Sequence, residues 1–463
     1  MLDLALFGFV MALFVLGLRR PFIWVLAYLY IDVLAPQKIG WALVKLLPVS
    51  FIAFLLAFAG WAIFDDKKTT RFTVRQGIMA LLLVYCFWTT QTADFPVNAA
   101  AKWEWVWRAL VFAIFLPLTL TTRLRIEAAL LTLLLSASAI VIAAGIKTAF
   151  GGGGYGNLYL FVNDNSNIYE SSTLAMAAIA IIPIALWFTR HGTIFAPDWR
   201  VKIFAGLLIF ACLLIPIGTE ARTGLLCIAV LGLMLLRDMK RRVLFIGGAA
   251  ALALLAVPFL PQSFTDRMAT IEDHSGDQSA STRVAVWQWT MDYATRHPFG
   301  GGFDAYRGNS FKYRMPVSVS DGRTTHITTQ DVEERARAYH SSIFEMLGEQ
   351  GYPGLAMWLL LHLLGLWQME KIRRGWRGRA GPDGWQAPLA SALQYAQVVY
   401  LVGATFQGIA YQPFILMLIG AQIALATHCA RTDSAREEAQ RKVRRATRRA
   451  AGAATASGEP AMP

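Results

Sequence analysis

Residues 339–354 read Tyr-His-Ser-Ser-Ile-Phe-Glu-Met-Leu-Gly-Glu-Gln-Gly-Tyr-Pro-Gly, and this stretch closes a long polar segment in an otherwise apolar chain. Ser342 and Glu345 have the spacing of a capping box, in which a hydroxyl and a carboxylate each satisfy a free N–H at a helix start. The glycines and proline at 351–354 predict an interruption of that helix. We therefore expect a short amphipathic helix on the membrane surface, then a break, then a descent into the bilayer. His340 precedes the helix, and an imidazole there has a suitable pKa for accepting a proton near neutral pH.

The composition places the chain among membrane proteins. Of its 463 residues, 56% are hydrophobic and only 16% are charged. Apolar runs of roughly 17 to 25 residues recur along the chain, which is the length that a helix needs to cross the hydrocarbon core. The runs are continuous, whereas a transmembrane β-barrel requires alternation. We predict an all-α polytopic membrane protein with about 12–13 transmembrane helices and one long, partly helical periplasmic loop.

The apolar runs divide the chain into four parts. We expect an N-terminal transmembrane bundle at 1–260, a periplasmic catalytic loop ending in an interfacial helix at 261–353, C-terminal transmembrane helices at 354–428, and a basic, partly disordered cytoplasmic tail at 429–463. Within the catalytic loop, residues 307–338 are expected to be irregular. The apolar runs themselves lie at 2–18, 21–34, 42–64, 77–90, 105–120, 127–147, 169–188, 203–217, 223–236, 243–260, 354–368, 389–408 and 412–428.

Basic residues occupy alternate connections between these runs. By the positive-inside rule such connections are cytoplasmic, which leaves His340 and the long polar loop on the outer side. The formal net charge of +13 is then mainly a topology signal, so we expect no nucleic-acid partner and a tail helix that rests on anionic membrane lipids. The basic residues are Arg19 and Arg20; Lys67, Lys68, Arg71 and Arg75; Arg123 and Arg125; Arg190, Arg200 and Lys202; Arg237, Lys240, Arg241 and Arg242; Lys371, Arg373, Arg374, Arg377 and Arg379; and Arg431, Arg436, Arg441, Lys442, Arg444, Arg445, Arg448 and Arg449.

Three further features lie on the predicted outer side. The glycine-rich and amide-rich stretch 151–167 lacks the lysine and the Ser/Thr of a phosphate-binding P-loop, so it is either a surface turn or a sugar contact. Arg222 opens an apolar helix after a short turn, where an ion pair with Glu220 and a substrate contact are both open interpretations. Arg283 follows a Ser-Thr pair that predicts a helix start, a favourable position for meeting phosphate.

The remaining chemistry favours phosphate recognition combined with base catalysis. The external histidines lack metal-ligand spacing and no G-x-S-x-G motif occurs, so we expect neither a metal nor a cofactor. Cations at helix ends suit a phosphorylated substrate, and a histidine suits deprotonation of an alcohol. Arg108 and Lys147 are further candidates, although Glu104 lies four residues before Arg108 on the same helix face. Together these residues indicate a substitution with a lipid diphosphate as the leaving group.

Three motifs follow one another in a fixed order. Arg222 lies in Ala-Arg-Thr-Gly, Arg283 lies in Ser-Thr-Arg, and His340 opens a pattern that continues through Glu345, Glu349 and the glycines at 348, 351 and 354. In order and spacing they resemble the O-antigen ligase and polymerase family. The opening Leu-Arg-Arg-Pro-Phe at 18–22, together with Leu-Ala-Pro at 34–36, is similar to the exosortase-associated O-glycosylation ligase branch.

This resemblance implies a metal-independent, inverting glycosyltransferase of lipopolysaccharide biosynthesis, with its active site on the periplasmic face of the bacterial inner membrane. The donor would be a preformed glycan on undecaprenyl diphosphate, and the acceptor a hydroxyl of lipid A–core, of a protein or of another lipid-linked glycan. His340 would be the general base, and Arg222 and Arg283 would hold the diphosphate. A transporter of lipid-linked sugars is a competing function of another class; it predicts inverted repeats and mid-span acids, which the sequence does not display.

Overall fold

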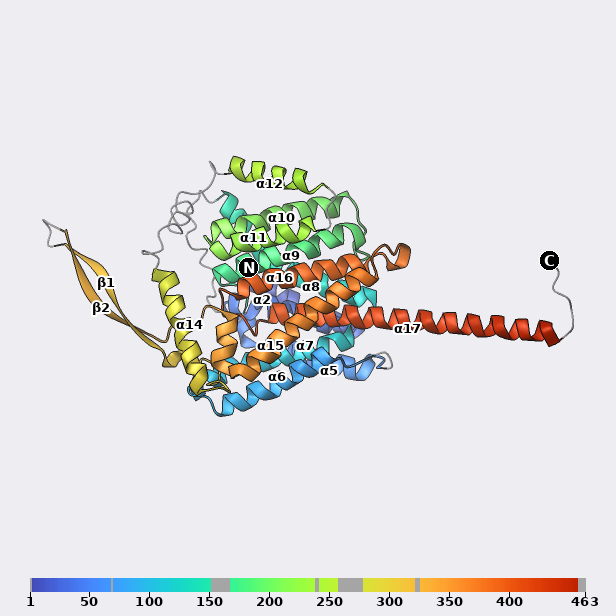
Figure 1. Cartoon of the computed structure of the whole chain (residues 1–463), viewed down its shortest axis with the longest axis horizontal. Helices are drawn as coiled ribbons and strands as arrows, with labels where there is room; N and C mark the ends of the chain where they lie inside the picture. Colours follow the sequence, from blue (N-terminus) through green and yellow to red (C-terminus); the bar gives the residue numbers. More distant parts are fainter. Residues whose placement is uncertain are drawn as a thin grey trace.

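The computed structural model describes residues 2–67, 70–150, 167–237, 241–256, 278–320 and 325–456, and these residues form an all-α bundle with one small hairpin (Figure 1). The predicted all-α membrane fold is confirmed. The helices of the N-terminal half are α1 (Leu2–Arg19), α2 (Phe22–Leu34), α3 (Pro36–Ile39), α4 (Leu43–Leu46), α5 (Val49–Phe64), α6 (Val74–Gln91), α7 (Pro96–Thr119), α8 (Arg123–Phe150) and α9 (Ser171–His191). They are followed by α10 (Trp199–Gly218), α11 (Arg222–Leu236), α12 (Arg242–Ala256), α14 (Gln278–Arg296), η2 (Ala305–Gly308), α15 (Ser342–Gly375), η3 (Gly381–Asp383), α16 (Gln386–Ala404) and α17 (Pro413–Ala456).

Among the described residues, 5 helices are long and apolar enough to cross a membrane. They are α1, α8, α9, α10 and the Pro413–Arg444 part of α17, and the shorter helices α2, α5 and α11 are also apolar. α9 is the most enclosed of the helices that precede the long polar loop, and it packs against α8, α10, α11 and α16. Its repeated alanines let these neighbours approach closely, as small residues do where helices meet in a membrane.

The segment predicted to be irregular contains a β-hairpin. β1 (Ser310–Ser320) pairs antiparallel with β2 (Thr325–Arg335), in a register that places Ser310 opposite Arg335. Figure 1 shows the hairpin projecting from the end of the bundle that also carries α14, whereas α17 extends from the opposite end. The hairpin and α14 of the long polar loop thus lie at the opposite end of the molecule from the described part of the basic tail.

The helix predicted from Ser342 begins there, but the capping box is wrong. The Ser342 hydroxyl donates to the Gln407 carbonyl at 2.8 Å and accepts from the Ile409 N–H at 2.9 Å. Glu345 accepts from the Ala410 N–H at 2.9 Å. Glu345 and Glu349 are buried, so this helix lies inside the protein and not on the membrane surface with its carboxylates in water.

The predicted interruption of the helix is confirmed. Gly351 has non-helical dihedral angles, with φ 61° and ψ −165°, and it separates the short helix from the apolar part of α15. Its neighbour Tyr352 donates its N–H to the Pro298 carbonyl at 3.0 Å, so the break is packed against the turn after α14.

Two basic segments of the sequence are placed by the structure. The basic tail continues the last apolar helix without a break as far as Ala456, while residues 457–463 lie outside the described part. Arg75, expected in a cytoplasmic connection, lies in the first turn of α6, is only 3% exposed and donates to Gln422 of α17 at 2.8 Å. A cation at this depth requires such an acceptor because water does not reach it.

Gly351→Ala tests the break in α15. We expect the free energy of unfolding to fall by at least about 2 kcal/mol, because an L-residue is strained at this φ and a methyl group would crowd the Pro298 carbonyl and lie 2.5 Å from the Gly300 nitrogen. Unfolding of the purified protein in detergent measures this change. Gly206→Ala is the control, since a methyl group there meets no atom within 4 Å; equal stability of the two variants would contradict the account.

Candidate functional site

His340 lies at a fixed turn between β2 and α15. Its φ is 47°, an uncommon left-handed conformation for a residue with a side chain. The Tyr339 carbonyl on one side accepts from Trp287 Nε1 at 2.9 Å. Further back, the buried Asn309 side chain donates to the Arg337 carbonyl at 2.8 Å and accepts from the Arg337 N–H at 2.9 Å. These contacts fix the backbone that carries the imidazole.

Arg283 and His340 are brought together by α14. Arg283 lies one helical turn before Trp287, so both side chains are on the same face of the helix. Trp287 in turn stacks on Phe344 of α15, with 5.0 Å between the ring centroids. One tryptophan therefore joins the helix of Arg283 to the start of the helix that follows His340.

The surroundings of His340 keep its imidazole neutral. Burial lowers the pKa of His340 below its ordinary 6.5, and the positive charges of Arg283 and Arg337 lower it further. Glu170 and Glu334 oppose this shift only partly. At neutral pH the ring is consequently unprotonated, which is the form that accepts a proton.

Arg222, the second arginine predicted to bind the diphosphate, is related to His340 through neighbouring residues. Half-buried Arg222 begins α11, and Gly224 in the same turn lies close to Ala175 near the start of α9. Glu170, which caps α9, is among the groups that act on His340. Arg222 is thus at the same end of the bundle as His340, whereas the largest electrostatic effects on His340 come from other residues.

Lys147 and Arg108 have different surroundings. Lys147 is exposed near the end of α8, next to Thr148, which packs against Gly218 just before α11. Arg108 lies 3.7 Å from Glu104, so the ion pair that its sequence spacing suggested is present. The stretch 151–166 lies outside the described residues.

A cavity of about 540 Å³ opens beside His340. Both halves of the chain line it: Lys38, Asn98, Ala101, Lys102, Trp105, Asp304, Tyr306, Arg307, Ala338, Tyr339, His340, Glu345, Glu349, Gly408, Ile409 and Tyr411. The sequence alone did not identify this cavity, because its walls come from α3, α7, η2, α15 and the segment between α16 and α17.

Lys102 is the central charge of this cavity wall. Its ammonium group lies 2.7 Å from Glu345 and 2.8 Å from Glu349, and 4.0 Å from Asp304. Glu349 also accepts from the Asp304 N–H at 3.0 Å. Lys102 was missed in the sequence, although a lone lysine at the predicted outer end of an apolar helix runs against the positive-inside pattern and is a signal for a buried partner.

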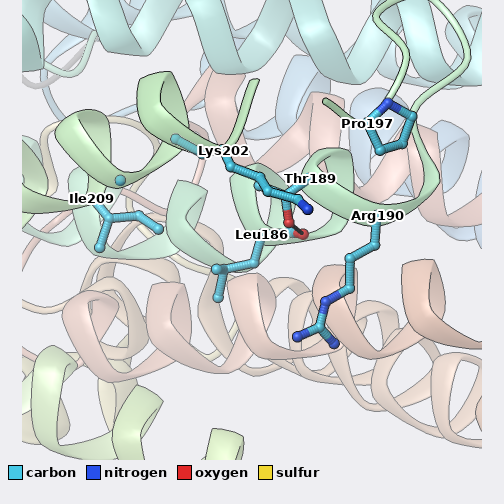
Figure 2. A pocket seen from close by; sticks show the side chains of 8 residues that line it. Leu186, Thr189, Arg190, Pro197, Lys202 and Ile209 are labelled. Carbon is cyan, nitrogen blue, oxygen red and sulfur yellow. Dashed lines mark hydrogen bonds between the residues drawn. The ribbon is translucent and has the colours of Figure 1, made fainter. Parts of the chain in front are cut away.

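A second pocket of about 570 Å³ lies at the other end of α9, between α9 and α10 (Figure 2). Its described lining contains Arg190, Lys202 and Thr189 among apolar side chains, but no carboxylate and no histidine. Figure 2 shows Arg190 extending away from Lys202, so these cations do not converge on one point. Nor does the described part of the chain bring three His, Cys, Asp or Glu side chains together as a metal site.

Lys102→Met tests the buried ion cluster. We expect a loss of about 3–5 kcal/mol in the free energy of unfolding, because two buried carboxylates lose their cation. Adding Glu345→Gln and Glu349→Gln should recover part of this loss, since both negative charges are removed. Lys442→Met is the matched control, because its pair with Glu438 is exposed to solvent. Equal unfolding temperatures for Lys102→Met and Lys442→Met would contradict a stabilising cluster.

Comparison with known families finds two matching regions in the chain. Residues 1–193 match the model of a family of unknown function (DUF5935), and residues 207–359 match the model of O-antigen ligase (Wzy_C). No curated protein matches the chain. Neither family match bears on the exosortase-associated branch, which stays a prediction. The second match contains Arg222, Arg283 and His340, and this part of the chain is similar to an O-antigen ligase-like family.

Proposed function

We propose that the protein is a glycan ligase that moves a preformed glycan from undecaprenyl diphosphate to an acceptor hydroxyl, that of lipid A–core in lipopolysaccharide biosynthesis. The family match supports a ligase-type or polymerase-type function at a membrane. The observation that carries the finer proposal is the placement of a neutral histidine beside Arg283 at the rim of a polar cavity. The site faces the periplasm of the bacterial inner membrane, and the basic tail faces the cytoplasm.

The reaction is a single substitution at the anomeric carbon. His340 takes the proton from the acceptor hydroxyl, and the oxygen attacks the anomeric carbon from the side opposite the leaving group. The bond to the diphosphate oxygen breaks, its electron pair stays on the diphosphate, and the configuration of the sugar is inverted. Arg283 and Arg222 stabilise the negative charge of the departing undecaprenyl diphosphate. No metal ion is required, because these cations meet the leaving group directly.

Three alternatives share some of this support. A protein O-glycosylation ligase would use the same donor with a protein hydroxyl, and a polymerase would extend a lipid-linked glycan by repeated transfers. A lipid-linked sugar transporter is the weakest alternative, since it gives no role to a neutral histidine at the rim of the cavity. Product analysis separates these functions: a ligase attaches a preformed chain once, and a transporter leaves it on its lipid.

His340→Ala and the two arginine variants test the assignment of roles. In proteoliposomes with a lipid-diphosphate glycan and lipid A–core, His340→Ala should lower the rate of transfer by about 10²–10⁴-fold while donor binding stays intact. Arg283→Ala and Arg222→Ala should weaken binding of the diphosphate lipid. Transfer at the original rate by His340→Ala, or unchanged donor binding together with unchanged transfer by both arginine variants, would refute these roles.

The pH dependence of transfer tests the state of His340 separately. Because burial and two arginines lower its pKa, kcat/KM should fall with decreasing pH only below 6.5. Arg337→Gln removes one of the positive charges that lower the pKa of His340, so it should move the midpoint to higher pH. A profile that Arg337→Gln leaves in place would show that a group other than His340 controls the acid limb.

A further inference from the structure

The cavity beside His340 receives one wall from the N-terminal region of unknown function. Asn98, Ala101, Lys102 and Trp105 lie on one face of α7, and Lys38 of α3 lies beside them at the cavity. All these residues fall within 1–193, whereas the opposite wall falls mainly within the ligase-like region. The N-terminal region therefore meets the catalytic region at the cavity where His340 lies.

The charges of the cavity are largely balanced. Lys102 is offset by Glu345 and Glu349, and Arg307 lies 3.6 Å from Asp304. With its amide oxygen turned toward Arg307, Asn98 accepts from that guanidinium at 3.2 Å. The cavity is lined by three cations, Lys38, Lys102 and Arg307, and three carboxylates, Asp304, Glu345 and Glu349, so it offers a diphosphate no net positive charge.

The uncharged lining suits a sugar. Trp105 and Tyr306 offer half-buried ring surface, and Asn98 adds an amide. Ring surface combined with a few placed polar groups is the usual lining of a small-molecule site, and 540 Å³ lies in the size range of such sites. Arg283 acts on His340 but is not among the described residues that line the cavity, so the cation assigned to the donor lies outside it.

We infer that this cavity is the acceptor site and that it binds a neutral sugar ring, whose hydroxyl points at His340. The face of α7 formed by Asn98, Lys102 and Trp105 then gives the N-terminal region of unknown function its role, which is the choice of acceptor. This inference rests on the proposed ligase function. It places the donor diphosphate on the Arg283 side of His340 and the acceptor sugar on the α7 side.

Steady-state kinetics with varied donor and varied acceptor test the inference. Trp105→Ala should raise KM for a lipid A–core acceptor about tenfold or more and leave KM for the donor within about twofold, since loss of one well-packed aromatic contact is worth that much. Trp105→Phe should retain most of the affinity. Trp199→Ala is the control, because Trp199 is 65% exposed at the start of α10, away from the cavity.

The outcomes separate this inference from the proposed function. Suppose that the unchanged protein transfers glycan, but that Trp105→Ala and Asn98→Ala leave KM for the acceptor unchanged or raise KM for the donor alone. The proposed acceptor site is then overturned, while the proposed ligase function is retained. If the unchanged protein transfers no glycan to any acceptor, both fall. Unfolding temperatures identify a variant that has lost its fold; if Trp105→Ala is such a variant, KM for the acceptor in Asn98→Ala decides, since Asn98 lines the same cavity. Tighter binding of an acceptor phosphorylated on the receiving sugar would also overturn the inference.

Discussion

The buried ion cluster around Lys102 is the interaction on which the arrangement of the site depends. One ammonium group joins α7 to two carboxylates of α15, and those carboxylates also accept backbone N–H groups of residues 304 and 410. Four separate parts of the chain therefore meet at one charge. A buried carboxylate without a cation is energetically costly. The short helix of α15 therefore cannot move away from Lys102 unless its glutamates become exposed to water or protonated.

This constraint explains the position of His340. The short helix after His340 is held by the ion pairs of its glutamates with Lys102. Trp287 of α14 donates a hydrogen bond to the Tyr339 carbonyl and stacks on Phe344. The imidazole of His340 therefore has the positive charge of Arg283 on one side and a cavity with balanced charges on the other. A glycosyl transfer needs this division, because a donor diphosphate calls for cations and an acceptor hydroxyl calls for a neutral base.

The helices could be predicted from the sequence, because membrane thickness sets the length of an apolar run; the run predicted at 169–188 corresponds to α9 at Ser171–His191. The break at Gly351 was equally local. The capping box failed because Ser342 and Glu345 bond to residues 65 or more positions away, and Lys102 was missed because its partners are 243 and 247 positions away. Sequence spacing suggested Arg283 and His340 as site residues, and their roles stay predictions. The helices α3 and α7, which complete the cavity, carry no motif that points to it.

The central claim is that this protein makes a covalent bond between a lipid-linked glycan and an acceptor sugar. Its most direct test is reconstitution of the purified protein with a defined glycan on undecaprenyl diphosphate and with lipid A–core, followed by determination of the product linkage. The account predicts one glycan chain per acceptor, joined with inverted anomeric configuration, and one undecaprenyl diphosphate released per transfer. A retained configuration, or a glycan that remains on its lipid while crossing the bilayer, would contradict it.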